Sequence, residues 1–407
     1  MRIAPDTAAS VPSRGAGRLG RRGGALAVTY AFTVTMLGTT LPTPLYALYR
    51  PRFGFSELMI TIIYATYAAG VIAALVLFGR LSDDIGRRRT LLPGLAFSGL
   101  SAGAFLLAQG LPLLLVGRLI SGLSAGIFTG TATAALVDFA APERRERATL
   151  VATMANMGGL GLGPLVAGAL IQWVGLRLRL TFWVDLALLV PAAAAIWLMS
   201  DPATPSGRLR LRPQGLTVPH EMRATFVRAS LAGFAGFAVL GLFTAVSPAF
   251  LAEILHRRSH ILLGAIVFAV FAASTAGQVA QARVPGTVAL PAGCGGLIVG
   301  MGLLALGLGL ASLALLVIGG VTAGFNQGLS FRAALAALNA EAPEDRRAAV
   351  ASSFFVVAYV ALSIPVIGVG LLTQAAGLRV AGYVFTGAVA VLAAAVLAMV
   401  RARAERR

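Results

Sequence analysis

Few charged residues lie inside the apolar stretches of this sequence, and Arg118 is the most prominent of them. A buried arginine costs several kcal/mol unless it is paired or faces water, so Arg118 is a candidate for organising a substrate site. The alternative is that its long side chain reaches the end of the stretch, about 8 Å away at ~1.5 Å per residue.

Uncharged polar side chains within the apolar stretches are candidates for lining the same cavity. They are Thr39 and Thr40, Tyr64 and Tyr67, Asn156, Gln278, Asn326 and Gln327. Such side chains also form hydrogen bonds between packed helices, so each has a purely structural interpretation as well. The adjacent residues Asn326 and Gln327 are the strongest pair among them. An aromatic wall from Phe234, Phe237, Phe268 and Phe271 would suit apolar or amphipathic compounds, although these side chains could equally face lipid.

Asp185 is the one carboxylate that clearly lies inside an apolar stretch. It could carry a proton, but it lies near the end of its stretch, and we expect it to pair with Arg177 or Arg179. The single cysteine, Cys294, excludes an intramolecular disulfide and any multi-cysteine metal site. We predict no cofactor and no metal.

Residues 79–89 (GRLSDDIGRRR) place glycines, aspartates and arginines between two apolar stretches. The glycines permit a sharp turn, and an aspartate can accept hydrogen bonds from the neighbouring arginines. We interpret the segment as a gate that latches one conformation; the alternative is a solvated basic loop. The predicted gating residues are Gly79, Asp83, Gly86, Arg87 and Arg88, together with Asp138 at the end of a later apolar stretch.

Residues 148–172 form an apolar stretch that is rich in glycine. Gly159, Gly163 and Gly168 would let a neighbouring helix approach closely. Pro164 would remove one helix hydrogen bond and bend the axis. The alternative is an ordinary packing face.

The elements that hold these residues must be membrane helices. Of the 407 residues, 58% are hydrophobic and 12% are charged, whereas soluble domains carry about 25% charged residues. The net charge of +18 comes entirely from arginine, but a mean hydropathy of +0.86 argues against a nucleic-acid partner. Twelve stretches are long enough to span a bilayer. They lie at roughly 25–47, 58–79, 90–110, 113–137, 148–172, 180–199, 229–251, 260–281, 287–307, 311–336, 348–372 and 379–400.

The arginines predict the orientation of these spans. With the N-terminus in the cytoplasm, 24 of the 33 arginines fall on the cytoplasmic side and 7 on the outer side. This asymmetry is the positive-inside pattern, so we expect both termini in the cytoplasm and the chain in the plasma membrane.

An internal repeat divides the chain into two halves. Residues 141–145 (APERR) recur as 342–346 (APEDR), and the register holds for about 35 residues, which suggests a duplication. The predicted fold is all-α, with twelve transmembrane helices in two pseudo-symmetric six-helix bundles. Its parts are a cytoplasmic tail (1–24), the first bundle (25–200), a cytoplasmic linker (201–228), the second bundle (229–400) and a second tail (401–407).

In this arrangement the sequence resembles the major facilitator superfamily. Residues 79–89 are similar to its signature between the second and third helices, with Asp84 where the family usually has arginine. Arg118 and Gly122 are similar to its helix-four motif, in which Ser121 replaces a frequent glutamine. The glycines and proline of residues 159–168 resemble the helix-five motif of the exporter, or antiporter, branch, with Ala167 in place of one glycine.

The resemblance implies a secondary transporter that exports small apolar or amphipathic compounds by alternating access, coupled to protons. Its partners would be the substrate, protons and the lipid bilayer, and it would act as a monomer. Within the same fold, the alternative is a permease for sugars or other metabolites. We do not expect an enzyme, because the sequence shows no nucleophile with a nearby base and no cluster of metal ligands.

Overall fold

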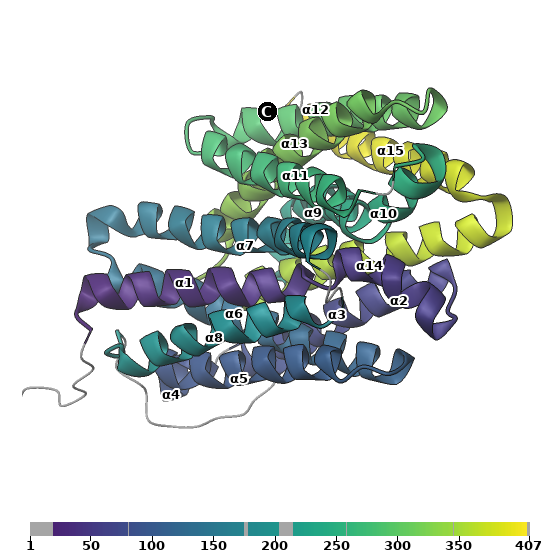
Figure 1. Cartoon of the computed structure of the whole chain (residues 1–407). Coiled ribbons are helices and arrows are strands. Elements are labelled where there is room, and N and C mark those ends of the chain that lie inside the picture. Colours follow the sequence, from purple (N-terminus) through teal and green to yellow (C-terminus); the bar gives the residue numbers. More distant parts are fainter. Residues whose placement is uncertain are drawn as a thin grey trace, which may run out of the picture.

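The computed structural model describes residues 19–79, 81–174, 178–202, 215–257, 259–344 and 346–404. The first eighteen residues, the arginine-rich part of the linker at 203–214, Arg177 and the last three residues lie outside these ranges. Long helices with nearly parallel axes make up the described chain (Figure 1), and its one β-type contact is an isolated bridge between Leu19 and Met199. The predicted all-α fold is confirmed.

Six long helices form each half of the molecule. The first half contains α1 (Arg21–Thr40), α3 (Glu57–Phe78), α5 (Arg87–Leu106), α6 (Leu111–Phe139), α7 (Arg145–Trp173) and α8 (Leu180–Leu198). The second half contains α9 (Arg223–Ala245), α11 (His260–Gln281), α12 (Gly286–Gly309), α13 (Leu313–Glu341), α14 (Arg347–Ala376) and α15 (Leu378–Ala404).

Short helical segments connect or extend the long helices. In the first half they are η1 (Thr43–Leu45), α2 (Tyr46–Phe53), α4 (Leu81–Ile85) and η2 (Pro142–Arg144). In the second half they are η3 (His220–Met222), α10 (Ser247–Ala249) and the π-helical turn η4 (Phe250–Ile254).

Within the described residues, eleven helical segments are long and apolar enough to cross a membrane. The remaining long helix is α5, whose 20 residues begin with three arginines and pack between α6 and α8. Helices suit a bilayer because each backbone polar group is satisfied within its own segment. With α5 the arrangement is consistent with twelve spans, as the sequence predicts.

Helix ends differ from the predicted spans where local chemistry decides them. The first predicted span is interrupted after Thr40, because Pro42 and Pro44 lack the N–H groups that would continue α1. In contrast, α9 begins at Arg223, six residues before the predicted span. Ser56 caps α3 by accepting a hydrogen bond from the Met59 N–H, as its position before Glu57 suggests.

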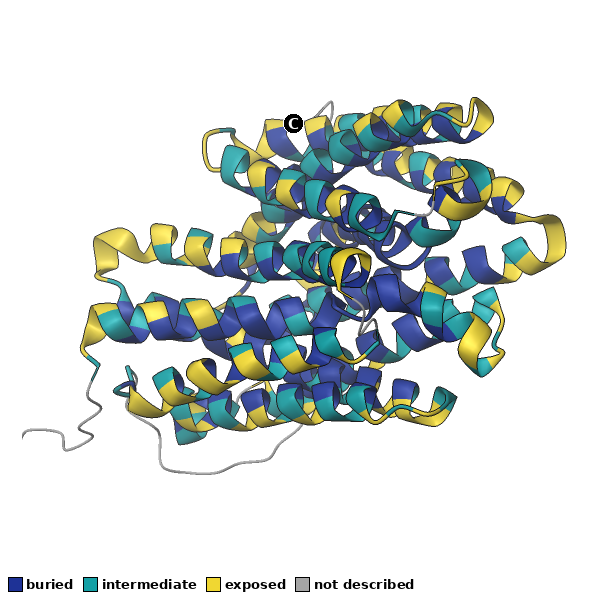
Figure 2. Cartoon of the chain, in the orientation of Figure 1, coloured by how far each residue is buried: buried dark blue, intermediate teal, exposed yellow. Residues whose placement is uncertain are grey.

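The two ends of the bundle differ in charge. We call the end at which α1 begins the basic face, and the opposite end the far face. Five helices start at the basic face with an arginine: Arg21, Arg87, Arg145, Arg223 and Arg347. Buried residues gather along the inner sides of both halves, and the sides that face outward are mostly exposed or half-buried (Figure 2).

The halves meet through two equivalent helix pairs. The fifth long helix of the first half, α7, packs on α11, the second long helix of the other half. The same relation holds in reverse, since α14 packs on α3. This reciprocal contact fits the duplication inferred from the repeated segment, and it surrounds the space between the halves.

Candidate functional site

Arg118 lies at the centre of the molecule and does not reach the end of its helix. Its side chain extends from α6 and is only 1% exposed. The Nη1 group donates a hydrogen bond to the backbone carbonyl of Thr39 in α1. The guanidinium carbon lies 4.6 Å from the ring centre of Tyr67 and 5.4 Å from that of Tyr64, both in α3.

This arginine has no ion pair with any described residue, and its Nε has no hydrogen-bond partner there. Two aromatic faces and one carbonyl stabilise a cation, but they leave its charge uncompensated. A buried positive charge of this kind favours a ligand that brings a carbonyl, carboxylate or other electron-rich group. The geometry therefore makes Arg118 the strongest ligand-binding candidate in the centre.

A small cavity of about 40 Å³ adjoins Arg118 and has two different walls. The first half contributes mainly polar groups to it: Thr39, Thr40, Tyr64, Tyr67, Thr129 and Asn156. The second half contributes mainly apolar and aromatic groups: Phe237, Leu240, Phe271, Phe355, Tyr359 and Leu362. A site with one polar and one apolar wall suits an amphipathic molecule. Drug-sized ligands need about 300–1,000 Å³, so the halves must separate to admit one.

Asn326 and Gln327, the predicted pair on α13, do not line this cavity. The Asn326 amide donates a hydrogen bond to the Thr322 carbonyl of its own helix and lies against Gly296 of α12. Gln327 is fully buried and accepts a hydrogen bond of 2.6 Å from Ser274 of α11. Both side chains contact neighbouring helices of the second half, so they serve helix packing, which is the structural alternative for polar residues in spans.

The predicted exporter motif on α7 forms two close contacts on different sides of the helix. Toward α1, a Cβ atom at Gly159 would lie 2.5 Å from the Thr33 carbonyl oxygen. A Cβ atom at Gly163 would lie 2.4 Å from the Leu37 carbonyl oxygen. These glycines let α7 rest directly on the backbone of α1.

Nearer the far face, α7 contacts α11 of the other half. A Cβ atom at Gly168 would lie 2.3 Å from the carbonyl oxygen of His260. In return, a Cβ atom at Gly264 of α11 would lie 2.3 Å from the carbonyl oxygen of Pro164. The motif thus joins α1 to the second half, and at its far-face end the backbones of α7 and α11 are in direct contact.

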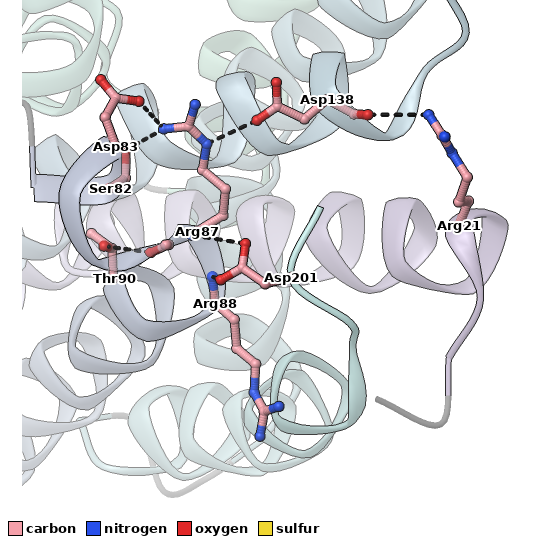
Figure 3. A network of polar contacts seen from close by, with 9 residues as sticks. Arg21, Ser82, Asp83, Arg87, Arg88, Thr90, Asp138 and Asp201 are labelled. Carbon is pink, nitrogen blue, oxygen red and sulfur yellow. Dashed lines mark hydrogen bonds and ion pairs between the residues drawn. The ribbon is translucent and has the colours of Figure 1, made fainter. Parts of the chain in front are cut away.

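Of the predicted gating residues, Asp83, Arg87 and Asp138 are joined through their side chains in a polar network at the basic face (Figure 3). Arg87 is its centre: it donates hydrogen bonds to Ser82 (2.6 Å) and Asp83 (2.5 Å), and its Nε donates to Asp138 at 2.9 Å. Gly86 has a φ of 102°, a backbone conformation that favours glycine and turns the chain into α5. The side chain of Arg88 points to a different partner, with its guanidinium 5.1 Å from the ring centre of Trp197.

These contacts join α4, α5 and α6 of the first half to one another. The described ion pair that links the two halves at this face is a different one, between Arg332 of α13 and Glu146 of α7, at 3.5 Å. Arg332 also donates a hydrogen bond to the Gln278 carbonyl in α11. Arg332 therefore has partners on both α7 and α11.

Asp201 belongs to the same network, although nothing in the sequence singles it out. Its two carboxylate oxygens accept hydrogen bonds from the backbone N–H groups of Arg87 and Arg88, each at 3.2 Å. Gly86 provides no side-chain cap for α5, so this carboxylate from the end of α8 serves as one. Only the tertiary fold reveals the role, because 113 or more residues separate the partners.

Asp185 is buried between α8 and α1. It is 2% exposed, and its Oδ1 has no hydrogen-bond partner among the described residues. The carboxylate lies against Gly38, where a Cβ atom would come within 2.8 Å of both oxygens. The expected ion pair with Arg179 is absent, since Arg179 is exposed at the helix end. Arg177, the other predicted partner, lies outside the described residues.

The described ranges show no candidate metal centre. They contain no group of three or more histidine, cysteine, aspartate or glutamate residues that could hold an ion. Cys294 is a buried residue of α12, and its thiol is free.

Two six-helix halves that pack reciprocally around a central polar site define a multi-pass membrane protein of transporter architecture. The sequence profile of the Major Facilitator Superfamily matches residues 26–364, which is most of the chain. The protein therefore belongs to this superfamily, as the resemblance of residues 79–89 predicts.

Among curated relatives, a triacylglyceride transporter of Mycolicibacterium smegmatis is 32% identical over 139 residues, which is 34% of this chain and 24% of that protein. An uncharacterized MFS-type transporter of Methanocaldococcus jannaschii is 25% identical over 148 residues, or 36% of this chain and 38% of that protein. These matches cover only about a quarter to two fifths of the relatives' length. They do not assign this chain to the drug-exporting branch.

Solved structures confirm the fold over nearly the whole chain. A bacterial homologue of the human lysosomal transporter Spinster, in an inward-facing and unoccupied conformation, superposes with a TM-score of 0.74 at 17% identity. The match covers 94% of this chain and 97% of that one. The human organic anion transporter MFSD10 gives a TM-score of 0.66 at 17% identity, covering 94% of this chain and all of that one.

Proposed function

We propose that the protein is a secondary transporter that exports amphipathic molecules by alternating access of its central site. The basic face would be cytoplasmic, because helix-starting arginines gather there and positive residues are retained on that side. The observation that carries the proposal is the uncompensated Arg118 at the contact between the halves.

The substrate class follows from the two walls of the central cavity. Arg118 and the hydroxyl groups around it favour a carboxylate or carbonyl group, and the phenylalanines opposite favour an apolar chain. A neutral or anionic amphiphile satisfies both walls. The relatives named for triacylglycerides and for organic anions support the same class, since those names describe apolar esters and anions.

Two observations support export and proton coupling. The glycine-rich helix α7 contacts α1 on one side and α11 on the other, so it can transmit a change at the central site to the far face. For the coupling ion, we propose Asp185 as the carrier. An ionised carboxylate with no cation and no donor to Oδ1 is costly inside a membrane protein, and binding a proton removes that cost.

Transport in proteoliposomes tests the proposal. A fluorescent fatty acid, a short-chain triacylglyceride, an organic cation dye and glucose would be loaded separately, with and without a pH gradient. We expect gradient-driven transport of the first two compounds. Replacing Arg118 with Gln should reduce it at least about tenfold, the loss expected when one charge-assisted contact worth ~1.5–3 kcal/mol is removed.

Asp185→Asn should retain exchange of substrate across the membrane while losing the response to the pH gradient. Glu143→Gln, an exposed residue at the basic face, is the matched control and should behave as the unmodified protein. Full transport by the Arg118 variant would exclude the proposed substrate site. Gradient-driven transport by Asp185→Asn would exclude the proposed proton carrier, and selective uptake of glucose would favour the permease.

A further inference from the structure

A cavity of about 410 Å³ lies between the two halves at the far face. The first half contributes α2 and the start of α3, and the second half contributes η4, the start of α11 and the end of α14. Its walls are mostly apolar, but the charged residues Arg50, Glu57, Glu253 and Arg257 also line it. A cavity with walls from both halves must change shape whenever the halves move.

One guanidinium group joins carboxylates from the two halves in this cavity. Arg50 of α2 forms a short ion pair with Glu57, the first residue of α3. The same Nη1 atom lies 3.9 Å from the Oε1 atom of Glu253, which belongs to η4 in the second half. Glu57 and Glu253 therefore face each other across the contact between the halves, and a single positive charge lies beside both.

Other charged groups near this pair come from the neighbouring elements. Arg257, which follows η4, and His260, at the start of α11, line the same cavity. The residues of α14 that line the cavity are uncharged. From α15 the cavity is lined by Leu378, and the next residue in the sequence, Arg379, is exposed. His260 is thus the one histidine in the cavity lining.

The carboxyl group of Glu253 titrates in the physiological range. Its pKa is raised from 4.5 to about 7, and burial is the largest cause. A hydrogen bond with Glu57 and the negative charge of Glu57 act in the same direction, and Arg50 opposes them. Below pH 7 the protonated Glu253 can donate this hydrogen bond across the halves, and above pH 7 two carboxylates share one arginine.

We propose that Glu57 and Glu253 form a proton-binding site between the two halves, and that the shared proton holds the far face closed. Arg50 orients both carboxylates and partly balances their charge. When the proton leaves, repulsion between the two carboxylates favours separation of the halves. The site lies at the far face in this closed arrangement, so its proton is bound and released on that side and is not carried across the membrane.

The direction in which pH shifts closure follows from the pKa of Glu253 in the closed and the open state. In the open state Glu253 is solvated and returns to its ordinary pKa of 4.5, so the closed state binds the proton more tightly. Acidification through pH 7 therefore favours closure, and alkaline conditions remove that effect. Between pH 8 and pH 6 the ratio of closed to open protein should rise by at most about tenfold. Solvent screening reduces this limit, because 48% of the Glu253 side chain is exposed.

This site deepens the proposed function, since export requires the far face to open, but its test needs neither substrate nor gradient. Spin labels would be attached to cysteines at Leu107, at the end of α5, and at Gln374, near the end of α14, in a Cys294→Ala background. Both positions are exposed and lie at the far face. Pulsed electron spin resonance in lipid nanodiscs then gives the distance distribution between the halves from pH 5.5 to 8.5.

We expect the short-distance population to grow on acidification, with a midpoint near neutral pH. Glu253→Gln, whose neutral amide can donate the same hydrogen bond, should hold the short distance at every pH. Glu57→Gln should move the midpoint to lower pH, because Glu253 loses the repulsion that raises its pKa. Glu143→Gln should leave the profile unchanged.

Three results would overturn the proposal. The first is a distance distribution of the unmodified protein that does not change with pH. The second is a Glu253→Gln variant whose distances depend on pH as those of the unmodified protein do. The third is a pH dependence that disappears in His260→Asn but persists in Glu253→Gln. If transport fails in proteoliposomes while the distances respond as expected, the proposed function fails and the proton site remains.

Discussion

Replacing Gly168 with Ala should weaken closure of the far face. In the closed arrangement the new Cβ atom would lie 2.3 Å from the carbonyl oxygen and 2.8 Å from the carbonyl carbon of His260. Both are backbone atoms, so no side-chain rotation relieves the contact. Restoring a carbon–oxygen separation of about 3.3 Å requires α7 and α11 to move apart by about 1 Å.

The cost of this overlap falls on one conformation only. Overpacking by a single methyl group typically costs about 1–3 kcal/mol, and the clash disappears once α7 and α11 separate. The variant should therefore shift the balance toward the state with an open far face by about 5-fold to 150-fold. Alanine has a higher helix propensity than glycine, so α7 itself should remain helical.

The assay is the same distance measurement between labels at Leu107 and Gln374, at fixed pH. We expect Gly168→Ala to increase the long-distance population strongly. The matched control is Gly158→Ala on the same helix, where a Cβ atom would meet nothing within 4 Å. If Gly168→Ala gives the distribution of the unmodified protein, or if Gly158→Ala changes it equally, the close contact does not control closure.

Two further predictions concern the basic face. Asp201→Ala removes the cap from the first turn of α5 and should lower the free energy of unfolding by about 1 kcal/mol. The measurement is the thermal midpoint of unfolding in detergent, with Glu143→Gln as the control. An unchanged midpoint would contradict the capping role. Glu146→Gln breaks the ion pair between the halves, but 70% of the Glu146 side chain is exposed, so the conformational balance should shift by less than about 5-fold. A shift of tenfold or more in the distance distribution would show that this pair controls the basic face.

The sequence predicts the fold well because the membrane makes the pattern simple. Apolar stretches of about 20 residues can only be helices in a bilayer, and the repeated segment divides them into halves. The prediction is weakest at helix ends. The prolines at 42 and 44 interrupt the first span, and α9 begins earlier than hydropathy suggests, because its first turns carry arginines.

The candidate site could be predicted only in part. A charged residue within a span is conspicuous, so Arg118 stands out, and Tyr67 and Thr39 are polar residues at similar depth. Asn326 and Gln327 look equally suitable in the sequence, yet the rotation of α13 directs them into the second half. Periodicity gives the faces of a helix, but not which face meets a cavity.

By itself, the sequence determined which residues are inside the membrane and at which end the arginines gather, since both follow from local composition. Only the tertiary structure decided which charges have partners. It brought Asp201 to the start of α5 and Glu253 to Glu57, and it left Arg118 and Asp185 unpaired within the described ranges. The physical reason is that pairing depends on distances of a few ångströms between segments separated by about a hundred residues or more, which helix packing alone sets.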